Sequence, residues 1–283
     1  MKQLVEIVKI ARPGFWPTQL WFYLLPFAGR DMFSTPAFWW GAVYVCFPLG
    51  LLLYGWNDIS DAESDRLNPR KDSWLFGARP DTAMRARLPW VIGLTQLPFA
   101  AVFVGLAGVK MLAWFAVAAA SNAAYNNLGF KRRPVLDLLN QAGYVLVFVL
   151  ASWLCDVPQL NAPAMVFSAL FAMQSHLFGQ LMDMDEDRAA GRRSTAIVIG
   201  LRPAKWLLVA ILAVEAVIAY LNFREPLVAV LMVGGVLFFA ADALFGPRKY
   251  PVAFIQVFFV GWNVVVVATM YFVWRYGVFL TAQ

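Results

Sequence analysis

Long apolar segments constrain this chain more than any other feature of its sequence. A membrane-spanning helix needs about 20 consecutive, mostly apolar residues. Nine segments of the 283-residue chain meet this requirement, at residues 14–30, 37–56, 88–108, 111–129, 135–154, 162–182, 204–222, 226–245 and 250–274. The chain is 61% hydrophobic and 14% charged, whereas a soluble domain has about half apolar and about a quarter charged residues. The sequence therefore predicts an all-α, polytopic membrane protein with nine transmembrane helices.

Lysine and arginine gather on one side of this nine-span layout. Nineteen of the 23 basic residues fall on the side of the amino terminus, and the other side carries Arg30, Lys110, Arg224 and Arg275. Because basic residues concentrate in short cytoplasmic loops, we expect a cytoplasmic amino terminus and an external carboxyl terminus, in the cell (inner) membrane. No small-residue cleavage site follows the first segment, so we expect it to be retained. Topology accounts for most of the basic residues, and we expect no nucleic-acid partner.

Eight of the 17 acidic residues lie in two short stretches, at residues 57–65 and 183–187. Each stretch directly follows an even-numbered span, the second and the sixth, so both are expected to face the cytoplasm. Ionisable groups next to apolar helix ends are costly and are usually functional. The alternative is a pair of solvated acidic loops that bind nothing. We expect Glu63 and Glu186 to be solvated in either case.

The spacing within these stretches indicates a metal site. Asn57, Asp61 and Asp65 recur at i, i+4 and i+8, beside Asp58, and therefore share one helical face. Asp183 and Asp187 repeat the i, i+4 spacing. Like charges so spaced repel each other, and hard divalent cations, which take oxygen ligands, would offset the repulsion. Because Mg²⁺ often combines one or two carboxylates with substrate phosphates, the pattern predicts Mg²⁺ ions that hold a diphosphate.

Basic residues on the same side would supply counter-charge to a diphosphate. Arg12 precedes the first span, and Lys131 follows the fourth span after Tyr125. The topology rule predicts these charges as well, so both interpretations stay open for Arg12 and Lys131. Arg132 and Arg133 are expected to serve topology or to contact lipid.

The two acidic motifs resemble those of a known family. Asn57-Asp58-x-x-Asp61-x-x-x-Asp65 is similar to the NDxxDxxxD signature of the UbiA superfamily of intramembrane prenyltransferases, and Asp183-x-x-x-Asp187 to its DxxxD partner. The early Arg12-Pro13 and the 125–131 stretch are similar to further diphosphate contacts of that family. The run at residues 65–71 looks like the carotenoid-elongating, lycopene elongase-like branch. The resemblance extends over nearly the whole chain.

This resemblance implies a single transmembrane prenyltransferase domain over residues 1–283, with its helices around a central cavity. Mg²⁺, with Mn²⁺ as an alternative, would polarise an isoprenoid diphosphate, whose departure leaves an allylic cation for a lipophilic acceptor such as a carotenoid or quinone precursor. Membrane lipids would surround the chain. The implied catalytic residues are Asp61, Asp65, Asp183 and Asp187. The implied diphosphate ligands are Arg12, Asn57, Tyr125 and Lys131, and the implied metal ligands are Asn57, Asp58, Asp61, Asp65, Asp183 and Asp187.

Two other functions are compatible with the sequence. A terpene cyclase of the same fold would ionise the same diphosphate and capture the cation within the molecule. A cation transporter would use the carboxylates for ion passage, but transport favours acids near the bilayer midplane of discontinuous helices. Here the acids follow the helix ends, close to arginines, which favours a metal-bound anionic substrate. In the fifth span, Asp137, Asn140 and Gln141 are polar and are expected to line the cavity.

Overall fold

The computed structural model describes residues 2–277 and 279, and its regular elements there are helices without strands. The longer helices are α1 (Lys2–Ile10), α2 (Trp16–Leu24), α3 (Pro36–Cys46), α7 (Thr82–Ala107), α8 (Lys110–Asn126), α10 (Leu146–Cys155), α11 (Ala162–Met182), α14 (Leu201–Asn222), α15 (Pro226–Phe245) and α16 (Val252–Tyr276). Short helices join them: α4 (Pro48–Gly50), α5 (Trp56–Ser60), α6 (Ala62–Leu67), α9 (Leu136–Leu139), α12 (Met184–Ala189) and α13 (Thr195–Ile199). The 3-10 turns are η1 (Pro13–Phe15), η2 (Leu25–Phe27), η4 (Phe130–Arg132) and η5 (Asn140–Val145), and η3 (Leu51–Gly55) is a π-helix.

Six continuous helical segments are long and apolar enough to cross a membrane, so the prediction of an all-helical membrane protein is confirmed but the count of nine is not. These segments are Pro36–Ser60, Thr82–Ala107, Leu136–Cys155, Leu201–Asn222, Pro226–Phe245 and Val252–Tyr276.

The other three predicted spans differ from this group for local reasons. Residues 14–30 form the nine-residue helix α2 between two 3-10 turns, each with a proline in its first positions. Residues 111–129 form α8, which has 17 residues. The 21-residue α11 is long enough, but Gln174, His176 and Gln180 lower its mean hydropathy.

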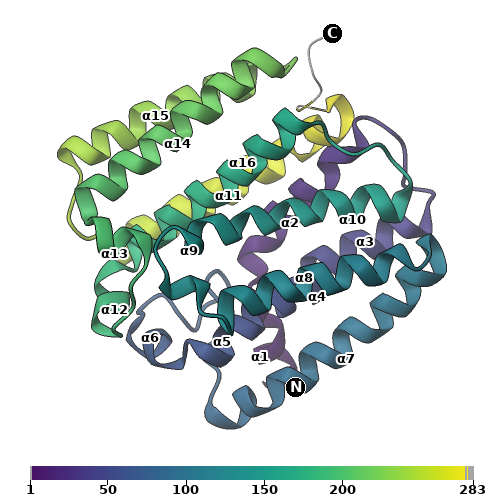
Figure 1. Ribbon diagram of the computed structural model, residues 1–283, viewed down its shortest axis with the longest axis horizontal. Coiled ribbons are helices and arrows are strands. Elements are labelled where there is room, and N and C mark those ends of the chain that lie inside the picture. The colour runs from purple at the N-terminus through teal and green to yellow at the C-terminus, as the bar shows by residue number, and fades with distance from the viewer. Residues whose placement is uncertain (1, 278, 280–283) are drawn as a thin grey trace.

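The helices pack side by side in one bundle with two distinct ends (Figure 1). The short helices α5, α6, α12 and α13 gather at the end where the amino terminus lies, and the last turns of α16 lie at the opposite end. The hairpin of α14 and α15 packs against α11. Both acidic stretches therefore lie at the same end of the molecule.

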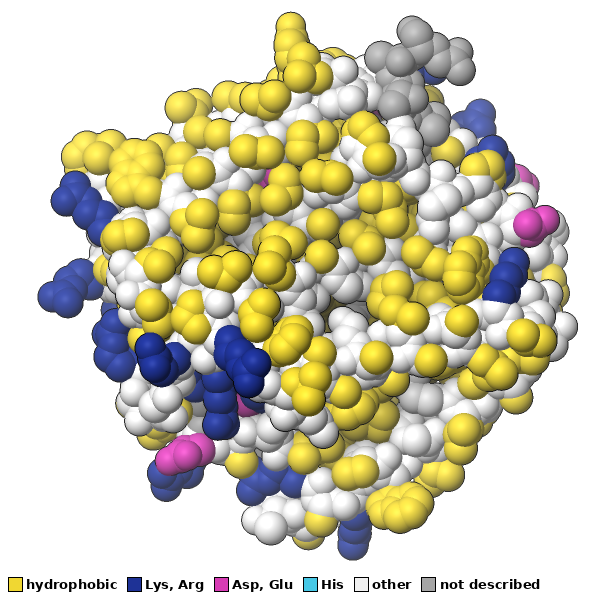
Figure 2. All heavy atoms as spheres, viewed as in Figure 1, with side chains coloured by type: hydrophobic (Ala, Val, Ile, Leu, Met, Phe, Trp, Pro, Cys, Tyr) yellow, Lys and Arg dark blue, Asp and Glu magenta, His cyan; other side chains and the backbone are white. Residues whose placement is uncertain are grey.

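The outside of the bundle is apolar, as lipid contact requires. Trp90 is 76% exposed on α7, and Val257 is 72% exposed on α16. Hydrophobic side chains cover most of the face shown in Figure 2, and lysines and arginines gather toward the end that carries α12 and α13. Inside, aromatic rings fill the core, as where Tyr44 packs on Phe103 at 5.2 Å between ring centroids.

A π-helix, η3, immediately precedes the first acidic motif. The carbonyl oxygen of Leu52 accepts a hydrogen bond from Asn122 Nδ2 at 2.9 Å, and that of Pro48 accepts one from Gln96 Nε2 at 2.9 Å. Side chains of α8 and α7 thus satisfy backbone groups of the irregular segment. Single π-turns inside α-helices occur frequently at functional sites, and this one sets the direction in which the motif leaves the helix.

Candidate active site

Each acidic motif lies at a break between two helices. Asp61 separates α5 from α6, and Asp183 separates α11 from α12. The continuous helical face predicted for residues 57–65 is therefore interrupted at Asp61, whose φ of −107° and ψ of 13° are not helical. The amide of Asp65 still donates to the carbonyl of Asp61 at 2.9 Å, and that of Asp187 to Asp183 at 2.8 Å. At each break the two aspartates stay one helical turn apart, and the short helix that follows runs in a new direction.

The two motifs meet at one cavity of about 370 Å³. Side chains from both ends of the sequence line it, including the predicted residues Arg12, Asn57, Asp61, Asp65, Tyr125, Lys131, Asp183 and Asp187. Asp58 does not line it. The Asp58 side chain points instead to Arg12 at 3.2 Å and to Lys71 at 2.7 Å, and its other carboxylate oxygen is buried without a hydrogen-bond partner among the described residues.

Arg12 and Lys71 form ion pairs with carboxylates of the first motif. Arg12 contacts Asp58 and lies over the ring of Tyr54 at 4.5 Å from its centroid. Lys71 reaches both Asp58 and, at 2.8 Å, Asp65. The side chain of Lys71 is buried, and so is that of Asp58, so each ion pair sits where water screens it little.

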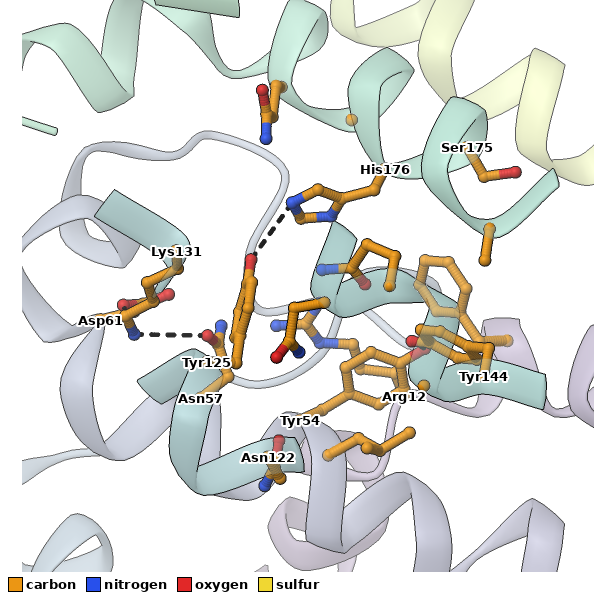
Figure 3. Close-up of a pocket in the computed structure, with 18 of the residues that line it drawn as sticks. Arg12, Tyr54, Asn57, Asp61, Asn122, Tyr125, Lys131, Tyr144, Ser175 and His176 are labelled. Atoms are coloured by element: carbon orange, nitrogen blue, oxygen red, sulfur yellow. Dashed lines mark hydrogen bonds and ion pairs between the residues drawn. The ribbon is translucent and has the colours of Figure 1, made fainter. Parts of the chain in front are cut away.

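Lys131, which lies in η4 after α8, contacts the same motif. Its ammonium group donates to a carboxylate oxygen of Asp61 and, at 3.4 Å, to Asn57 Oδ1. It also contacts Ser60 Oγ and, at 3.1 Å, Asn126 Oδ1. Lys131 is 5% exposed. Figure 3 shows this lysine beside Asp61 and Asn57 at one side of the cavity.

Arg192 connects the two motifs. Its guanidinium group lies 2.6 Å from an oxygen of Asp61 and 3.2 Å from an oxygen of Asp187. In the second motif, Arg70 forms an ion pair with Asp183, and Asn68 Nδ2 donates to the same carboxylate at 3.0 Å. The carboxylates thus share a set of basic partners drawn from four separate segments of the chain.

Asp137 fixes the segment that carries Arg192. It is fully buried and, unlike Asn140 and Gln141, does not line the cavity. Its carboxylate accepts hydrogen bonds from Gln180 Nε2 at 2.7 Å, from the Thr195 amide at 2.6 Å and from the Thr195 hydroxyl. Asp137 therefore joins α9, α11 and the beginning of α13. The expectation that it lines the cavity is wrong, because these donors turn it toward α13.

Burial and charge affect the carboxylates differently. Burial favours the neutral form of Asp61, but Arg192 and Lys131 outweigh it and hold the pKa of Asp61 below its usual value. Burial raises the pKa of Asp187 to about 7, although Arg192 opposes that shift. Burial likewise raises the pKa of Asp65, against the effect of Lys71. At neutral pH the carboxyl group of Asp187 in the second motif is therefore close to the midpoint of its titration.

The donor set fits a hard divalent cation. The carboxylates of the two motifs and the Asn57 side-chain oxygen offer oxygen ligands to the cavity, which suits Mg²⁺ or Mn²⁺. Within residues 2–277 and 279, no three His, Cys, Asp or Glu side chains gather closely enough to enclose a metal by themselves. An ion that takes one or two carboxylates and completes its shell with phosphate oxygens and water does not need such a group.

Several lining residues were missed by the sequence interpretation. The topology rule alone explains Arg70, Lys71 and Arg192, although each follows an acidic motif within six residues and lines the cavity. That proximity was the available signal. Glu186 was expected to be solvated but lines the cavity and accepts from Lys249 Nζ at 2.7 Å. Glu63, Arg132 and Arg133 are exposed, as expected.

Aromatic side chains contribute much of the rest of the cavity wall, beside aliphatic and uncharged polar ones. Phe15, Phe22, Trp114, Tyr144 and Phe171 line it, and Phe22 packs on Phe171 at 5.8 Å between centroids. On α11 and α8, His176 Nε2 and the Tyr125 hydroxyl lie 3.2 Å apart and face each other across the cavity wall (Figure 3). One cavity therefore combines a charged mouth with a hydrophobic interior.

Six apolar helical segments identify an integral membrane protein, and its cavity brings charged and apolar side chains together. Family comparison makes the assignment specific. The family model described as the UbiA prenyltransferase family matches residues 15–265. The chain belongs to this family, and it is a prenyltransferase.

Relatives and solved structures agree with the family. A lycopene elongase/hydratase of Haloarcula japonica is 32% identical over 202 residues, which cover 69% of this chain and 67% of the relative. One of Corynebacterium glutamicum is 29% identical over 77% of each chain. The structure of a UbiA homolog from Archaeoglobus fulgidus bound to GPP and Mg²⁺ superposes with a TM-score of 0.71 and 17% identity, over 95% of this chain and 99% of the homolog. The corresponding DMAPP and Mg²⁺ complex gives a TM-score of 0.70.

Proposed function

We propose that this chain transfers a prenyl group from an isoprenoid diphosphate to a lipophilic acceptor in a reaction that depends on Mg²⁺, with Mn²⁺ as an alternative. One observation carries the proposal: carboxylates of both motifs and the basic residues paired with them line the same cavity as a group of aromatic and aliphatic side chains. A diphosphate with its metal suits the charged end, and an isoprenoid chain suits the apolar end. The solved Archaeoglobus homologs, which bind GPP or DMAPP with Mg²⁺, support this division.

The residues divide into two groups by their chemistry. Asn57, Asp61, Asp65, Asp183 and Asp187 would hold the metal, which supplies Lewis-acid polarisation of the diphosphate when bound. Arg12, Asn57, Tyr125 and Lys131 would contact the diphosphate, together with Arg70, Lys71 and Arg192. Asp58, which lies behind the cavity wall, would orient Arg12 and Lys71.

The transfer follows from this arrangement. The lysine and arginine side chains stabilise the negative charge that develops on the departing diphosphate. Departure breaks the carbon–oxygen bond and leaves an allylic carbocation, which aromatic faces stabilise. An alkene or ring carbon of the acceptor captures this carbocation, and the acceptor then loses a proton to the released diphosphate. The apolar wall limits the access of bulk water to the cation.

An acyclic carotenoid is the acceptor that we favour over a quinone precursor. The support comes from relatives named lycopene elongase/hydratase, matched over most of this chain. No described contact favours a terpene cyclase, which would release a product without any acceptor. Cation transport is less consistent with the site, because the acidic side chains follow the helix ends and each has a basic partner.

For the chain in its membrane, we propose one transmembrane prenyltransferase domain over residues 1–283. The first, fourth and sixth predicted spans would also cross, which restores nine crossings. The amino terminus and both motifs would face the cytoplasm of the cell (inner) membrane, with the carboxyl terminus outside. The support is the division of 19 basic residues from four.

Replacement of one carboxylate in each motif tests the proposed function. We expect Asp61→Ala and Asp183→Ala to abolish prenyl transfer, and excess EDTA to abolish it in the unmodified protein until Mg²⁺ is restored. Mass spectrometry of products from a prenyl diphosphate, with and without a carotenoid, provides the measurement. Glu63→Ala and Asp185→Ala are matched controls because both acids are exposed beside the motifs, and they should retain activity. Full turnover in EDTA would contradict the metal requirement, and a prenyl-derived hydrocarbon formed without acceptor would identify a cyclase.

A further inference from the structure

Gln19 presents an unpartnered amide to the apolar part of the cavity. It lies on α2, lines the cavity and is 3% exposed. Neither its side-chain oxygen nor its side-chain nitrogen has a hydrogen-bond partner among the described residues. A buried amide without partners is destabilising, and more so in an apolar environment. Such a group therefore requires a reason other than folding.

Other buried amides of the protein show what a structural role looks like. Asn122 donates to the Leu52 carbonyl, and Gln141 donates to the Asp137 carbonyl at 3.0 Å. Gln180 uses both ends of its amide, donating to Asp137 and accepting from the Ala196 amide. Asn122 and Gln180 thereby connect two segments of the chain, and Gln141 bonds within its own helical turn. Gln19 connects nothing within the described residues, so its two polar atoms are available to a bound molecule.

The surroundings of Gln19 favour a neutral ligand over the diphosphate. Phe15, the last residue of η1, precedes Gln19 by about one turn, Phe22 follows it by one turn on α2, and both rings line the cavity. Phe15 packs on Tyr54, whose ring also carries the Arg12 guanidinium. Gln19 lies roughly 6 Å further along the helix axis than Phe15. An amide between two aromatic rings suits a neutral oxygen atom rather than an anion.

We propose that the Gln19 amide is a binding subsite for a hydroxyl-type oxygen within the apolar part of the cavity. An amide offers one donor group and one acceptor, and a hydroxyl group or a water molecule can use both. The oxygen comes either from a water molecule or from a terminal hydroxyl group of the acceptor. The choice of ligand rests on the proposed function. A pure hydrocarbon acceptor would not need a polar group such as Gln19 for its binding.

If the oxygen is water, the subsite determines the product. Addition of the allylic cation to a terminal alkene of the acceptor forms a carbon–carbon bond and leaves a tertiary carbocation. The water oxygen then forms a carbon–oxygen bond to that carbon, and the proton it loses passes to the released diphosphate. Without water at this position, the tertiary cation loses a proton from an adjacent carbon to the same diphosphate and yields an alkene.

Gln19→Met tests the subsite because methionine keeps the length of the side chain and removes both polar atoms. Gln256→Met is the matched control, since Gln256 is exposed on α16. The full-length proteins are compared in detergent. We expect Gln19→Met to keep or raise the melting temperature, because it breaks no bond within the described protein, and to leave the KM for the prenyl diphosphate unchanged.

Two readouts distinguish the sources of the oxygen. In ¹⁸O-labelled water, a water subsite predicts a labelled tertiary alcohol from the wild type and a ratio of alcohol to alkene about tenfold lower in Gln19→Met, as expected for one lost hydrogen bond. A subsite for the acceptor hydroxyl predicts no label. In that case the wild type binds a terminally hydroxylated acyclic carotenoid more tightly than the parent hydrocarbon, and Gln19→Met loses that preference.

Wild-type values for both the product ratio and the hydroxyl preference in Gln19→Met would overturn the inference, as would a wild type that shows neither label nor preference. A melting temperature lowered by the substitution, with both readouts unchanged, would identify Gln19 as a structural residue. Absence of prenyl transfer to any carotenoid by the wild type would refute the proposed acceptor, and the binding comparison would still decide the role of Gln19.

Discussion

Lys131 is the residue for which topology and substrate binding make different predictions. Its ammonium group is buried against the first motif and donates to Asp61, whereas its neighbours Arg132 and Arg133 are exposed. A charge-assisted hydrogen bond to an anion contributes about 1.5–3 kcal/mol. We therefore expect Lys131→Ala to lower kcat/KM for the prenyl diphosphate roughly 10- to 150-fold. The decrease should be the same with every acceptor.

Arg132→Ala provides the matched control for Lys131→Ala. It removes an exposed charge from the same loop and should leave the kinetics unchanged. Steady-state kinetics on correctly inserted protein measure both variants. Wild-type kinetics in Lys131→Ala would assign this lysine to topology alone.

Asp187 gives the site a predictable response to pH. Burial raises its pKa to about 7, so the carboxyl group is protonated below that pH and ionised above it. A divalent cation requires the ionised form and must displace the proton at lower pH. We expect the apparent Kd for Mn²⁺, followed by electron paramagnetic resonance, to rise up to about tenfold per pH unit below 7, as for one displaced proton. Asp187→Asn should bind more weakly and lose this pH dependence, and a Kd that is constant from pH 8 to pH 6 would contradict the assignment.

The sequence identified the carboxylates because their spacing is a local property. Asp61, Asp65, Asp183 and Asp187 all reach the cavity. It did not identify Arg192, because pairing of this arginine with both motifs depends on how a loop folds back across α12. The sequence interpretation also misplaced Asp58. The carboxylates that face the cavity are determined by the three-dimensional packing around the break at Asp61. Gln19 gave no signal at all, because an amide without partners is visible only once its neighbours are known.

At the scale of elements, Asp137 holds three helices together through one carboxylate. Asp137→Ala would leave the buried donors of Thr195 and Gln180 without an acceptor, at about 1–3 kcal/mol for each donor. We expect a lower melting temperature and, because the segment that carries Arg192 is released, a higher KM for the prenyl diphosphate. Thermal unfolding and steady-state kinetics provide the measurements.

Thr195→Val is the partial counterpart, because it removes the hydroxyl donor and keeps the backbone amide. It should show a smaller effect of the same kind on both the melting temperature and KM. The two substitutions combined should have less than additive effects, since they remove the same contact. Unchanged stability and KM in Asp137→Ala would show that α11 and α14 hold the segment without this carboxylate.

Helix positions were largely predictable from apolar length, but their regularity was not. The segments at 204–222 and 226–245 correspond closely to α14 and α15. The segment at 14–30 is divided because prolines at positions 13, 17 and 26 favour the beginnings of new helical turns. The segment at 135–154 includes a 3-10 stretch, whose hydrogen-bonding pattern hydropathy does not encode.

At the scale of the molecule, labelling of single cysteines tests the proposed orientation. Ala83→Cys and Arg193→Cys lie beside the two motifs, and Lys110→Cys lies beyond α7 at the start of α8. All three positions are exposed. In a protein whose native Cys46 and Cys155 have been replaced, we expect positions 83 and 193 to react from the cytoplasm and position 110 from outside. Reaction of positions 83 and 193 from opposite sides of the membrane would contradict a shared site.

The direction in which the side chains of the first motif point depends on the number of residues in the π-helix η3. Each residue advances an α-helix by about 100°, so loss of one residue between Leu51 and Gly55 would turn Asn57 and the residues after it by about that angle. Side chains that now face the cavity would then face α7 or lipid. Within this turn, apolar residues can exchange over evolutionary time with little consequence, whereas a deletion or insertion cannot. Conservation in related chains should therefore be strict for the number of residues here and for Tyr54, whose ring lies under the Arg12 guanidinium, and relaxed for the identity of the leucines.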